Sequence, residues 1–278
     1  MQTHPLSETY YVPPPSIWPL VGSVALLALA VGFVLVLNDQ AAGKYVTGLG
    51  AAILLVMLFG WFGNVIHESL SGKYAGQVDR SFRWGMVWFI FSEVMFFAGF
   101  FGALFYARQL AVPMLADAQQ LWPGFTAAWP TAGPGATVAP TPVHAWGIPA
   151  VNTLILLSSG ATVTWAHWGV IKGSQSQLKL GLAATIVLGI VFIGLQAYEY
   201  GEAAFTIRDG IYGATFYMLT GFHGFHVMLG TVMLIVVFLR SLAGHFTAER
   251  HFAFEAVAWY WHFVDVVWLL LFVFVYWL

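Results

Sequence analysis

Five ionisable side chains interrupt long apolar stretches of the sequence, and these residues are the candidates for chemistry. They are Glu93, His223, His226, His262 and Asp265. Glu93 lies ten residues after Arg83, which is about 15 Å along a helix and therefore near the middle of a bilayer. His262 precedes Asp265 by three residues, so the two side chains share one helix face. We expect all five to converge on the interior of a helix bundle, because exposing such groups to lipid is costly.

Three kinds of chemistry are open to these five groups. They can form a buried hydrogen-bond network that fixes helix register, they can exchange protons or bind an ion, or they can bind a metal. His223 and His226 supply two imidazoles, whereas a closed metal site needs about four ligands and a catalytic site needs three. Metal binding is therefore the weakest of the three interpretations.

The composition shows where these residues must lie. Of the 278 residues, 60% are hydrophobic and only 8% are charged, whereas a soluble domain carries about 25% charged residues. A net charge of −2 offers no basic surface for nucleic acid, and the absence of cysteine excludes disulfides, thiolate catalysis and iron–sulfur clusters. The sequence predicts an all-α integral membrane protein that does not bind nucleic acid.

Gaps between charged residues predict seven transmembrane helices in a single domain that covers residues 1–278. Each is about 20 residues or longer, which is enough to cross a bilayer. The expected spans are 17–37, 46–66, 84–106, 149–168, 178–198, 212–239 and 256–278. Residues 1–66 form a two-helix N-terminal part and residues 84–278 a five-helix bundle. Residues 111–149, rich in proline, alanine and glycine, are expected to form an extracytoplasmic loop packed on the protein surface.

The basic residues predict the orientation of the chain. With the N-terminus inside, seven basic residues lie on the inner side: Lys73, Arg80, Arg83, Lys172, Lys179, Arg240 and Arg250. Only Lys44, Arg108 and Arg208 then lie outside. The positive-inside rule places the N-terminus in the cytoplasm and the C-terminus outside.

A second group of polar residues lies at the expected cytoplasmic border. His67 and Glu68 end the second span, and Arg240 and His245 follow the sixth. Such residues are commonly interface anchors. The alternative is a phospholipid headgroup site, because cations pair with phosphate and a carboxylate can accept from an ethanolamine ammonium.

Small residues on two spans predict close helix packing near the intramembrane polar groups. Ala98 with Gly102 and Gly99 with Ala103 form small-xxx-small pairs, and Gly221 and Gly224 lie beside the two histidines of the sixth span. Gly is also common in membrane helices for other reasons.

Several sequence strings, in order along the chain, are specific enough to indicate a family. They are SEVMFF at 92–97, TWAH at 164–167, EY at 199–200, FTI at 205–207, DGIYG at 209–213, TGFHGFHV at 220–227, FEA at 254–256 and WYWHFVDVVW at 259–268. Together they resemble bacterial members of the subunit III family of the haem–copper cytochrome c oxidases, over the chain from about Trp18 to its end.

This resemblance implies a seven-helix subunit whose first two helices splay from the other five, with phospholipids held in the cleft. It implies no catalytic residue, cofactor or metal in this chain, haem and copper in partner subunits, direct packing on subunit I, and subunit II in the same complex. It further implies a modulatory role for Glu93, support of subunit I during proton uptake, lipid contacts from His67, Glu68, Arg240 and His245, and a bacterial inner membrane with a periplasmic C-terminus. His67 stands where other members often have arginine.

Three other interpretations remain open at this point. A subunit III of a quinol oxidase is the first, although that branch usually lacks the two N-terminal helices found here. A proton or ion transporter is the second, but it would benefit from an internal repeat or discontinuous helices, and neither is visible. An autonomous haem or copper enzyme is the third, and it would need more intramembrane histidine ligands.

Overall fold

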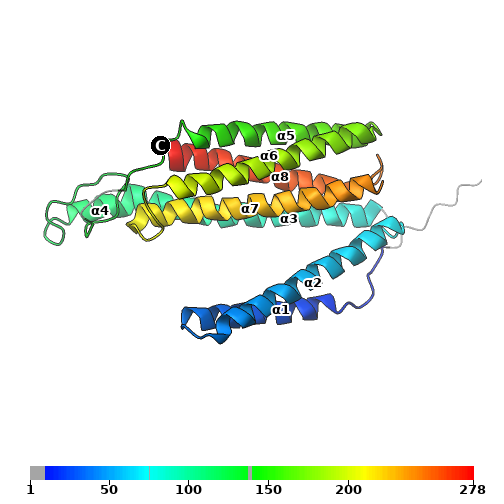
Figure 1. Cartoon of the computed structure of the whole chain (residues 1–278), viewed down its shortest axis with the longest axis horizontal. Helices are drawn as coiled ribbons and strands as arrows, with labels where there is room; N and C mark the ends of the chain where they lie inside the picture. The colour runs from blue at the N-terminus through cyan, green and yellow to red at the C-terminus, as the bar shows by residue number, and fades with distance from the viewer. Residues whose placement is uncertain (1–9, 75, 137–139) are drawn as a thin grey trace, which may run out of the picture. The chain divides into compact units, whose positions relative to one another are not determined.

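The computed structural model describes residues 10–74, 76–136 and 140–278, and this part of the chain is helical without β-strands (Figure 1). Seven helical segments in it are long and apolar enough to cross a membrane, which confirms the predicted number. The elements are α1 (Trp18–Leu37), α2 (Ala42–Leu70), α3 (Gly76–Tyr106), a π-helical segment η1 (Ala107–Ala111), α4 (Val112–Asp117), α5 (Ile148–Ile171), α6 (Gln175–Glu202), α7 (Gly210–Leu242), α8 (Phe252–Leu271) and a second π-helical segment η2 (Phe272–Trp277).

Most helices extend beyond the predicted spans at one or both ends. α2 continues through His67 and Glu68 to Leu70, and α6 continues through Glu199 to Glu202. Gaps between charged residues find only the lipid-embedded part of a helix, whereas charged side chains near helix ends can reach water or headgroups.

The segment expected to be a loop over residues 111–149 is helical at its start. The helix of α3 continues through η1 into α4 and ends at Asp117, so irregular structure begins at Ala118. Pro113 lacks an N–H for the helical ladder, and the π-helical segment just before it changes the pairing of the backbone at that point. The irregular segment then packs on the bundle: the Trp129 ring lies 5.7 Å from that of Tyr212.

The chain divides into two compact units, and the first ends at Phe82. In this unit α1 and α2 pack closely because small residues line their contact. A Cβ added to Gly50 would lie 2.7 Å from the backbone nitrogen of Leu29, and one added to Gly32 would lie 2.5 Å from that of Thr47. The predicted splay of these helices from the other five remains a prediction.

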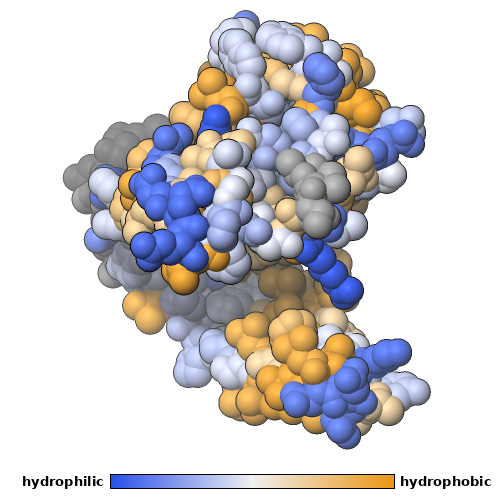
Figure 2. Space-filling view, turned by 90° about the vertical axis from the view of Figure 1, so that its left-hand side faces the viewer, coloured by the Kyte–Doolittle hydropathy of each residue, from blue (hydrophilic) through white to orange (hydrophobic). Residues whose placement is uncertain are grey.

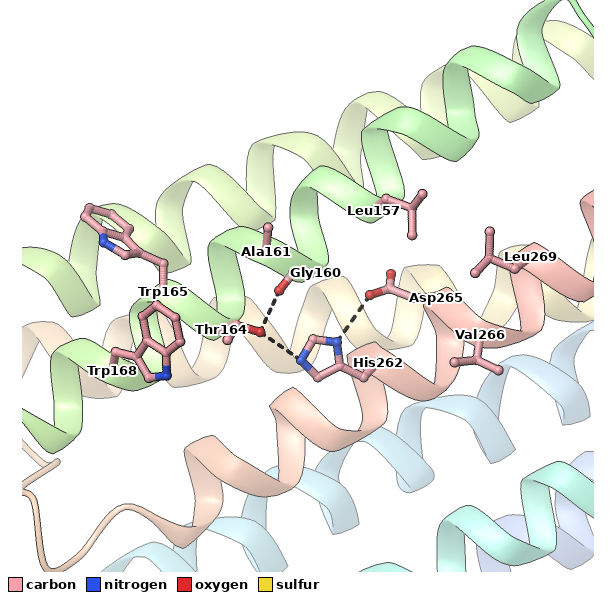
Figure 3. A pocket seen from close by; sticks show the side chains of 10 residues that line it. All are labelled: Leu157, Gly160, Ala161, Thr164, Trp165, Trp168, His262, Asp265, Val266 and Leu269. Atoms are coloured by element: carbon pink, nitrogen blue, oxygen red, sulfur yellow. Dashed lines mark hydrogen bonds and ion pairs between the residues drawn. The ribbon is translucent and has the colours of Figure 1, made fainter.

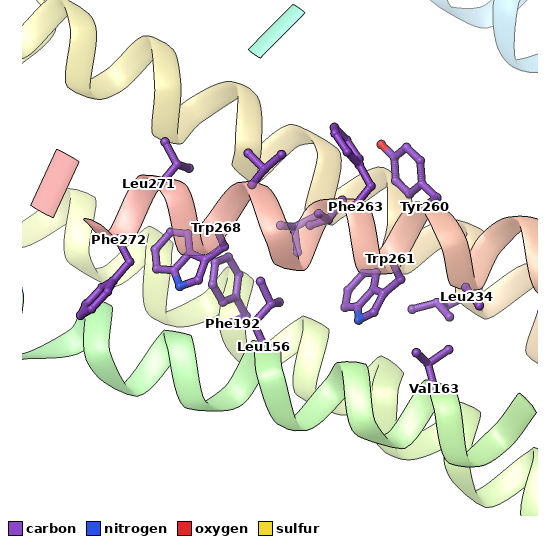
Figure 4. Packing of buried hydrophobic residues seen from close by; sticks show 14 of the residues in the cluster. Leu156, Val163, Phe192, Leu234, Tyr260, Trp261, Phe263, Trp268, Leu271 and Phe272 are labelled. Carbon is purple, nitrogen blue, oxygen red and sulfur yellow. The ribbon is translucent and has the colours of Figure 1, made fainter. Parts of the chain in front are cut away.

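The second unit, Arg83 to Leu278, is organised around α8. In α8 and η2, 56% of the most apolar window is buried, compared with 11% in the helix that runs from α3 to α4. Trp261 carries much of this packing (Figure 4): its indole lies within 3 Å of a Cβ added to Gly189 of α6 or to Gly230 of α7. Its Nε1 donates to Ser159 Oγ of α5 at 2.9 Å. One side chain of α8 therefore packs against α5, α6 and α7.

The outer surface of the helices is apolar. Figure 2 looks onto one end of the helices and shows hydrophilic residues gathered there, with apolar side chains around the flanks. Large side chains such as Leu27, Phe59 and Leu154 are exposed by 65%, 75% and 67% of their surface. Exposing so much apolar surface to water is unfavourable, whereas contact with the hydrocarbon of a membrane is favourable. The chain is a multi-pass membrane protein.

Candidate functional site

Glu93 and His226 form a pair between α3 and α7. Glu93 Oε2 lies 2.8 Å from Nε2 of His226. The other ring nitrogen of His226, Nδ1, lies 2.6 Å from the carbonyl oxygen of Phe222, one turn earlier on α7. The histidine side chain is 9% exposed and the glutamate side chain 22%, so the pair is largely withdrawn from lipid.

The hydrogen bonds of this pair fix how many protons it holds. The Phe222 carbonyl can only accept, so Nδ1 of His226 carries a hydrogen. If the imidazole is neutral, its Nε2 has a lone pair and Glu93 must be the protonated donor. If the carboxyl is ionised, His226 must be an imidazolium. The pair has no net charge in either case, which suits its place inside the membrane.

His262 and Asp265 form a second pair on α8, at a groove of about 510 Å³ between α5 and α8 (Figure 3). The His262 Nδ1 lies 3.4 Å from Asp265 Oδ2. Its Nε2 lies 3.2 Å from the hydroxyl of Thr164 on α5, and that hydroxyl donates to the carbonyl of Gly160 at 2.9 Å. The hydroxyl is therefore an acceptor for His262 Nε2–H, and the carboxyl and the ring again share one proton without net charge.

Glycine makes the approach of Asp265 to α5 possible. A Cβ on Gly160 would lie 2.5 Å from Asp265 Oδ2, which is closer than real Cβ atoms come to another heavy atom. Asp265 is 7% exposed, whereas the His262 side chain is 45% exposed and faces the groove. The His262 ring is therefore a polar group on an otherwise apolar outer surface.

His223 is the third intramembrane histidine, and it is 1% exposed. Its Nε2 donates to the carbonyl of Val264 on α8 at 3.1 Å. The Nδ1 atom has no hydrogen-bond partner among the described residues. The ring packs beside Trp268, with centroids 5.3 Å apart. Because Nδ1 finds no acceptor there, the arrangement fits a neutral imidazole that ties α7 to α8.

We expected all five groups to converge on the interior of the bundle. His223, His226 and Asp265 are buried there, whereas the His262 side chain is 45% exposed. The structure brings Glu93 to His226 and His262 to Asp265, and it places His223 on a backbone carbonyl. Two small pairs without net charge are less costly than one cluster of charges.

The glycines that were expected to allow close packing near these groups do not all do so. Within the described residues, a Cβ on Gly99, Gly102 or Gly224 would meet no atom within 4 Å, and one on Gly221 would meet only the Tyr200 hydroxyl. Small residues at helical spacing therefore did not identify the close contacts in α3 and α7.

Comparison with known proteins agrees with this architecture over the whole chain. Residues 8–278 match the family model described as cytochrome c oxidase subunit III. The chain belongs to the cytochrome c oxidase subunit III family. It is 46% identical to cytochrome c oxidase subunit 3 of Marchantia polymorpha over 277 residues, which are 99% of this chain and 97% of the relative. The corresponding protein of Arabidopsis thaliana is 45% identical over 271 residues, 97% of this chain and 96% of the relative.

The residues of the two polar pairs lie within the sequence strings that resemble this family. The string 92–97 on α3 contains Glu93, and the string 220–227 on α7 contains His223 and His226. The string 259–268 on α8 contains His262 and Asp265. Residues far apart in the sequence thus meet in the second unit of this oxidase-family chain.

Arg240 and His245 lie together where α7 ends. The backbone N–H of His245 donates to the Arg240 carbonyl at 3.1 Å, and the guanidinium lies 4.8 Å from the centre of the Phe246 ring. Arg240 Nε and His245 Nδ1 are buried, and in the described part of the chain neither has a hydrogen-bond partner. A polar nitrogen without a partner is suited to an anionic oxygen, and both of these lie on residues at the end of α7.

In the first unit, Glu68 is paired and His67 is exposed. The Tyr74 hydroxyl donates to Glu68 Oε2 at 2.8 Å. Burial and the Glu68 carboxylate raise the pKa of Tyr74 above its usual value. Glu68 and Tyr74 line a cavity of about 500 Å³ together with aromatic residues that include Tyr11, Trp18 and Trp61. The two lipid candidates on α2 thus have different surroundings.

Two polar groups were missed by the sequence analysis. Glu199 is 3% exposed, and its Oε1 accepts from the Tyr276 hydroxyl at 2.6 Å and from Gln196 at 3.0 Å. The predicted span ended at Tyr198, so Glu199 fell outside the expected membrane region. The second group, His167, His251 and Glu255, has residue types that bind metals. His251 and Glu255 are spaced i and i+4, a signal that could have revealed one helix face.

Proposed function

We propose that this chain is a non-redox integral subunit of a cytochrome c oxidase complex. In this role it packs against subunit I, supports proton uptake there and preserves activity during oxygen reduction, while haem and copper are held by partner subunits. Membership of the subunit III family supports the place in the complex.

The observation that carries the non-redox role is how the intramembrane histidines are used. Five of the six ring nitrogens of His223, His226 and His262 face another protein group within 3.4 Å. A haem or copper ion would need free ring nitrogens directed at one point. These histidines are spread over separate partners, so they are better suited to holding helices together.

A supporting role also fits the charge state of the polar pairs. The hydrogen bonds of His226 end on a backbone carbonyl and on Glu93, and those of His262 end on Thr164 and Asp265. Each pair can shift its proton internally without gaining charge. Such a pair can adjust the local field beside a partner's proton path, and this is the modulatory role that we propose for Glu93.

The test is to compare the purified oxidase with and without this chain. We expect the haem spectra and the initial rate of oxygen consumption to persist without it, while activity declines faster during turnover. Stoichiometric haem, or copper bound by His223, His226 or His262, on the full chain purified alone would overturn the proposal. Loss of the initial rate, with haem and the other subunits retained, would show that the chain has an obligatory part in the reaction.

The end of α7 supports a second part of the proposal, that the chain binds phospholipid. Arg240 and His245 each offer a nitrogen without a partner in the described residues, and the phosphate of a headgroup would satisfy such a nitrogen. On α2, His67 and Glu68 are likewise proposed as contacts to phospholipid headgroups.

Lipid binding can be measured by native mass spectrometry of the complex. Arg240→Gln removes the charge but keeps a polar side chain, and loss of its charge-assisted contact is expected to cost about 1.5–3 kcal/mol and to reduce phospholipid retention. Arg250→Gln, at an exposed arginine of the same loop region, is the matched control. Equal lipid counts in both variants would return Arg240 to the role of an interface anchor.

Cytochrome c rather than quinol is proposed as the electron donor of the complex. The relatives from Marchantia polymorpha and Arabidopsis thaliana are named cytochrome c oxidase subunits, and α1 and α2 precede the five other spans. The distribution of basic residues supports a cytoplasmic N-terminus and a C-terminus on the opposite side of the membrane, and we propose that this membrane is a bacterial inner membrane.

A further inference from the structure

His167, His251 and Glu255 come together where α5 ends and α8 begins. His167 lies in the last turns of α5, His251 is the residue just before α8, and Glu255 is in its first turn. None of the polar pairs described above includes these residues. We propose that the three side chains bind one divalent transition-metal ion of the Zn²⁺ type.

The spacing of the ligand atoms supports this proposal. The Glu255 Oε1 atom lies 3.4 Å from Nε2 of His167 and 3.5 Å from Nε2 of His251. With metal–ligand bonds of about 2.0–2.2 Å, neighbouring ligands of a tetrahedral Zn²⁺ lie about 3.3–3.6 Å apart. The ligand atoms of all three residues lie within 4.8 Å of one another, so only a small contraction would close the site.

The His251 ring is oriented as a metal-binding histidine would be. Its Nδ1 lies 3.0 Å from the carbonyl oxygen of Thr247, which can only accept, so this nitrogen carries the hydrogen. When a metal ion displaces the proton from Nε2, the lone pair of that atom is directed to the side of Glu255. A bond from the second ring nitrogen to a backbone carbonyl is the usual way in which proteins orient a metal-binding histidine.

His167 and Glu255 are also placed as metal ligands would be. The His167 Nε2 atom is buried and, among the described residues, has no hydrogen-bond partner, because its contact with Glu255 lacks hydrogen-bond geometry. Arg83 pairs with Glu255 through Oε2 and leaves Oε1 directed at the two imidazoles. A metal ion would satisfy the unpaired nitrogen, and Arg83 would hold the carboxylate in place.

The donor set also indicates which ions fit. Two imidazoles and a carboxylate suit Zn²⁺ and similar transition metals, whereas Ca²⁺ and Mg²⁺ prefer sets made of oxygen atoms. Three protein ligands leave a fourth position for water. Because the ligands come from two helices, the ion would tie the end of α5 to the start of α8.

The test uses the full chain purified in detergent and Zn²⁺ as the probe. Equilibrium dialysis with radioactive Zn²⁺ is expected to show one ion per chain, and Mg²⁺ is expected not to displace it. X-ray absorption at the zinc edge should show two imidazoles and an oxygen ligand. His251→Asn and Glu255→Gln should each weaken binding at least about 100-fold, since even outer-shell changes cost 10- to 100-fold.

His144→Asn is the matched control, because His144 is exposed and lies outside the cluster. Its affinity for Zn²⁺ should equal that of the unmodified chain, and circular dichroism should confirm that the variants are folded. Failure of the unmodified chain to bind Zn²⁺ would overturn the proposal. A bound ion without imidazole ligands in the absorption spectrum would also overturn it, whatever the variants do. None of these results depends on the role of the chain in the oxidase.

Discussion

Glu93 Oε2 lies 2.8 Å from Nε2 of His226, and the other nitrogen of that ring is committed to the Phe222 carbonyl. The carboxyl and the imidazole therefore share one titratable proton across α3 and α7. This relationship explains how a glutamate can lie within a membrane helix: its charge is cancelled by the proton on one partner or the other.

Two substitutions of Glu93 test its hydrogen bond and its ionisable proton separately. Glu93→Gln can still donate to the lone pair of His226, so assembly and oxygen consumption should persist. Glu93→Ala leaves Nε2 of His226 without a partner in a buried place, which should destabilise the subunit by about 1–3 kcal/mol. Thermal denaturation of the purified complex and its rate of oxygen consumption measure both effects. If Glu93→Gln assembles but consumes no oxygen, Glu93 is an obligatory proton carrier.

The shared proton also predicts selective labelling of Glu93. A hydrophobic carbodiimide enters lipid and reacts with a protonated carboxyl group, and the Glu93 side chain is 22% exposed within a membrane helix. Glu199 should react far less, because it is 3% exposed. Peptide mass spectrometry of the labelled complex locates the adduct, and Glu93→Gln should remove it. An adduct mainly on the exposed Glu202 would show that Glu93 is not the reactive acid.

The raised pKa of Tyr74 predicts how the first unit responds to high pH. Burial, together with the Glu68 carboxylate, raises this pKa in the folded state above the ordinary value of about 10. The folded protein therefore holds the phenolic proton longer than the unfolded chain does. The resulting stability is complete below about pH 10 and is lost as the pH rises through the folded-state pKa.

Spectrophotometric titration of the phenolates tests this prediction. Tyr74→Phe should remove a component that titrates above the ordinary range, and Glu68→Gln should move that component to lower pH without removing it. If Tyr74→Phe leaves the titration above pH 10 unchanged, the Tyr74 hydroxyl does not have the buried, carboxylate-paired surroundings described here.

Much of the fold follows from where charge is absent. The first span was predicted at 17–37 and α1 runs from Trp18 to Leu37, because a bilayer excludes charged residues over a fixed length. The ends of the helices were less predictable. α3 continues through η1 to Asp117, since backbone rearrangement at a proline depends on local packing that spacing does not encode.

The polar pairs of the candidate site could likewise be predicted from the sequence only in part. The cost of burying ionisable groups identified Glu93 and Asp265 from sequence, but their partners depend on how the helices are rotated. The contact between Glu93 and His226 joins positions 133 residues apart, which no local pattern reveals. His167, His251 and Glu255 escaped notice for the opposite reason: near helix ends polar residues are ordinary, so their type alone attracts no attention.

Gly160 offers a sharp test of the packing between α5 and α8. A Cβ at this position would lie 2.5 Å from Asp265 Oδ2 and 3.6 Å from Nδ1 of His262. Gly160→Ala should therefore push the aspartate away and weaken its pairing with His262, at a cost of about 1–3 kcal/mol. Gly194→Ala on α6 is the control, because within the described residues its Cβ would meet no atom closer than 4 Å. That variant should be neutral or slightly stabilising, since alanine favours helix.

The origin of this cost can be isolated with a double substitution. Asp265→Ala removes the oxygen atom that the new methyl group would meet. The double variant Gly160→Ala/Asp265→Ala should therefore be less destabilised than the sum of the single variants, by an amount that reports their contact. Thermal denaturation of the four complexes supplies the cycle. Additive effects would mean that α5 and α8 adjust independently at this point, and that Gly160 is not required for the approach of Asp265.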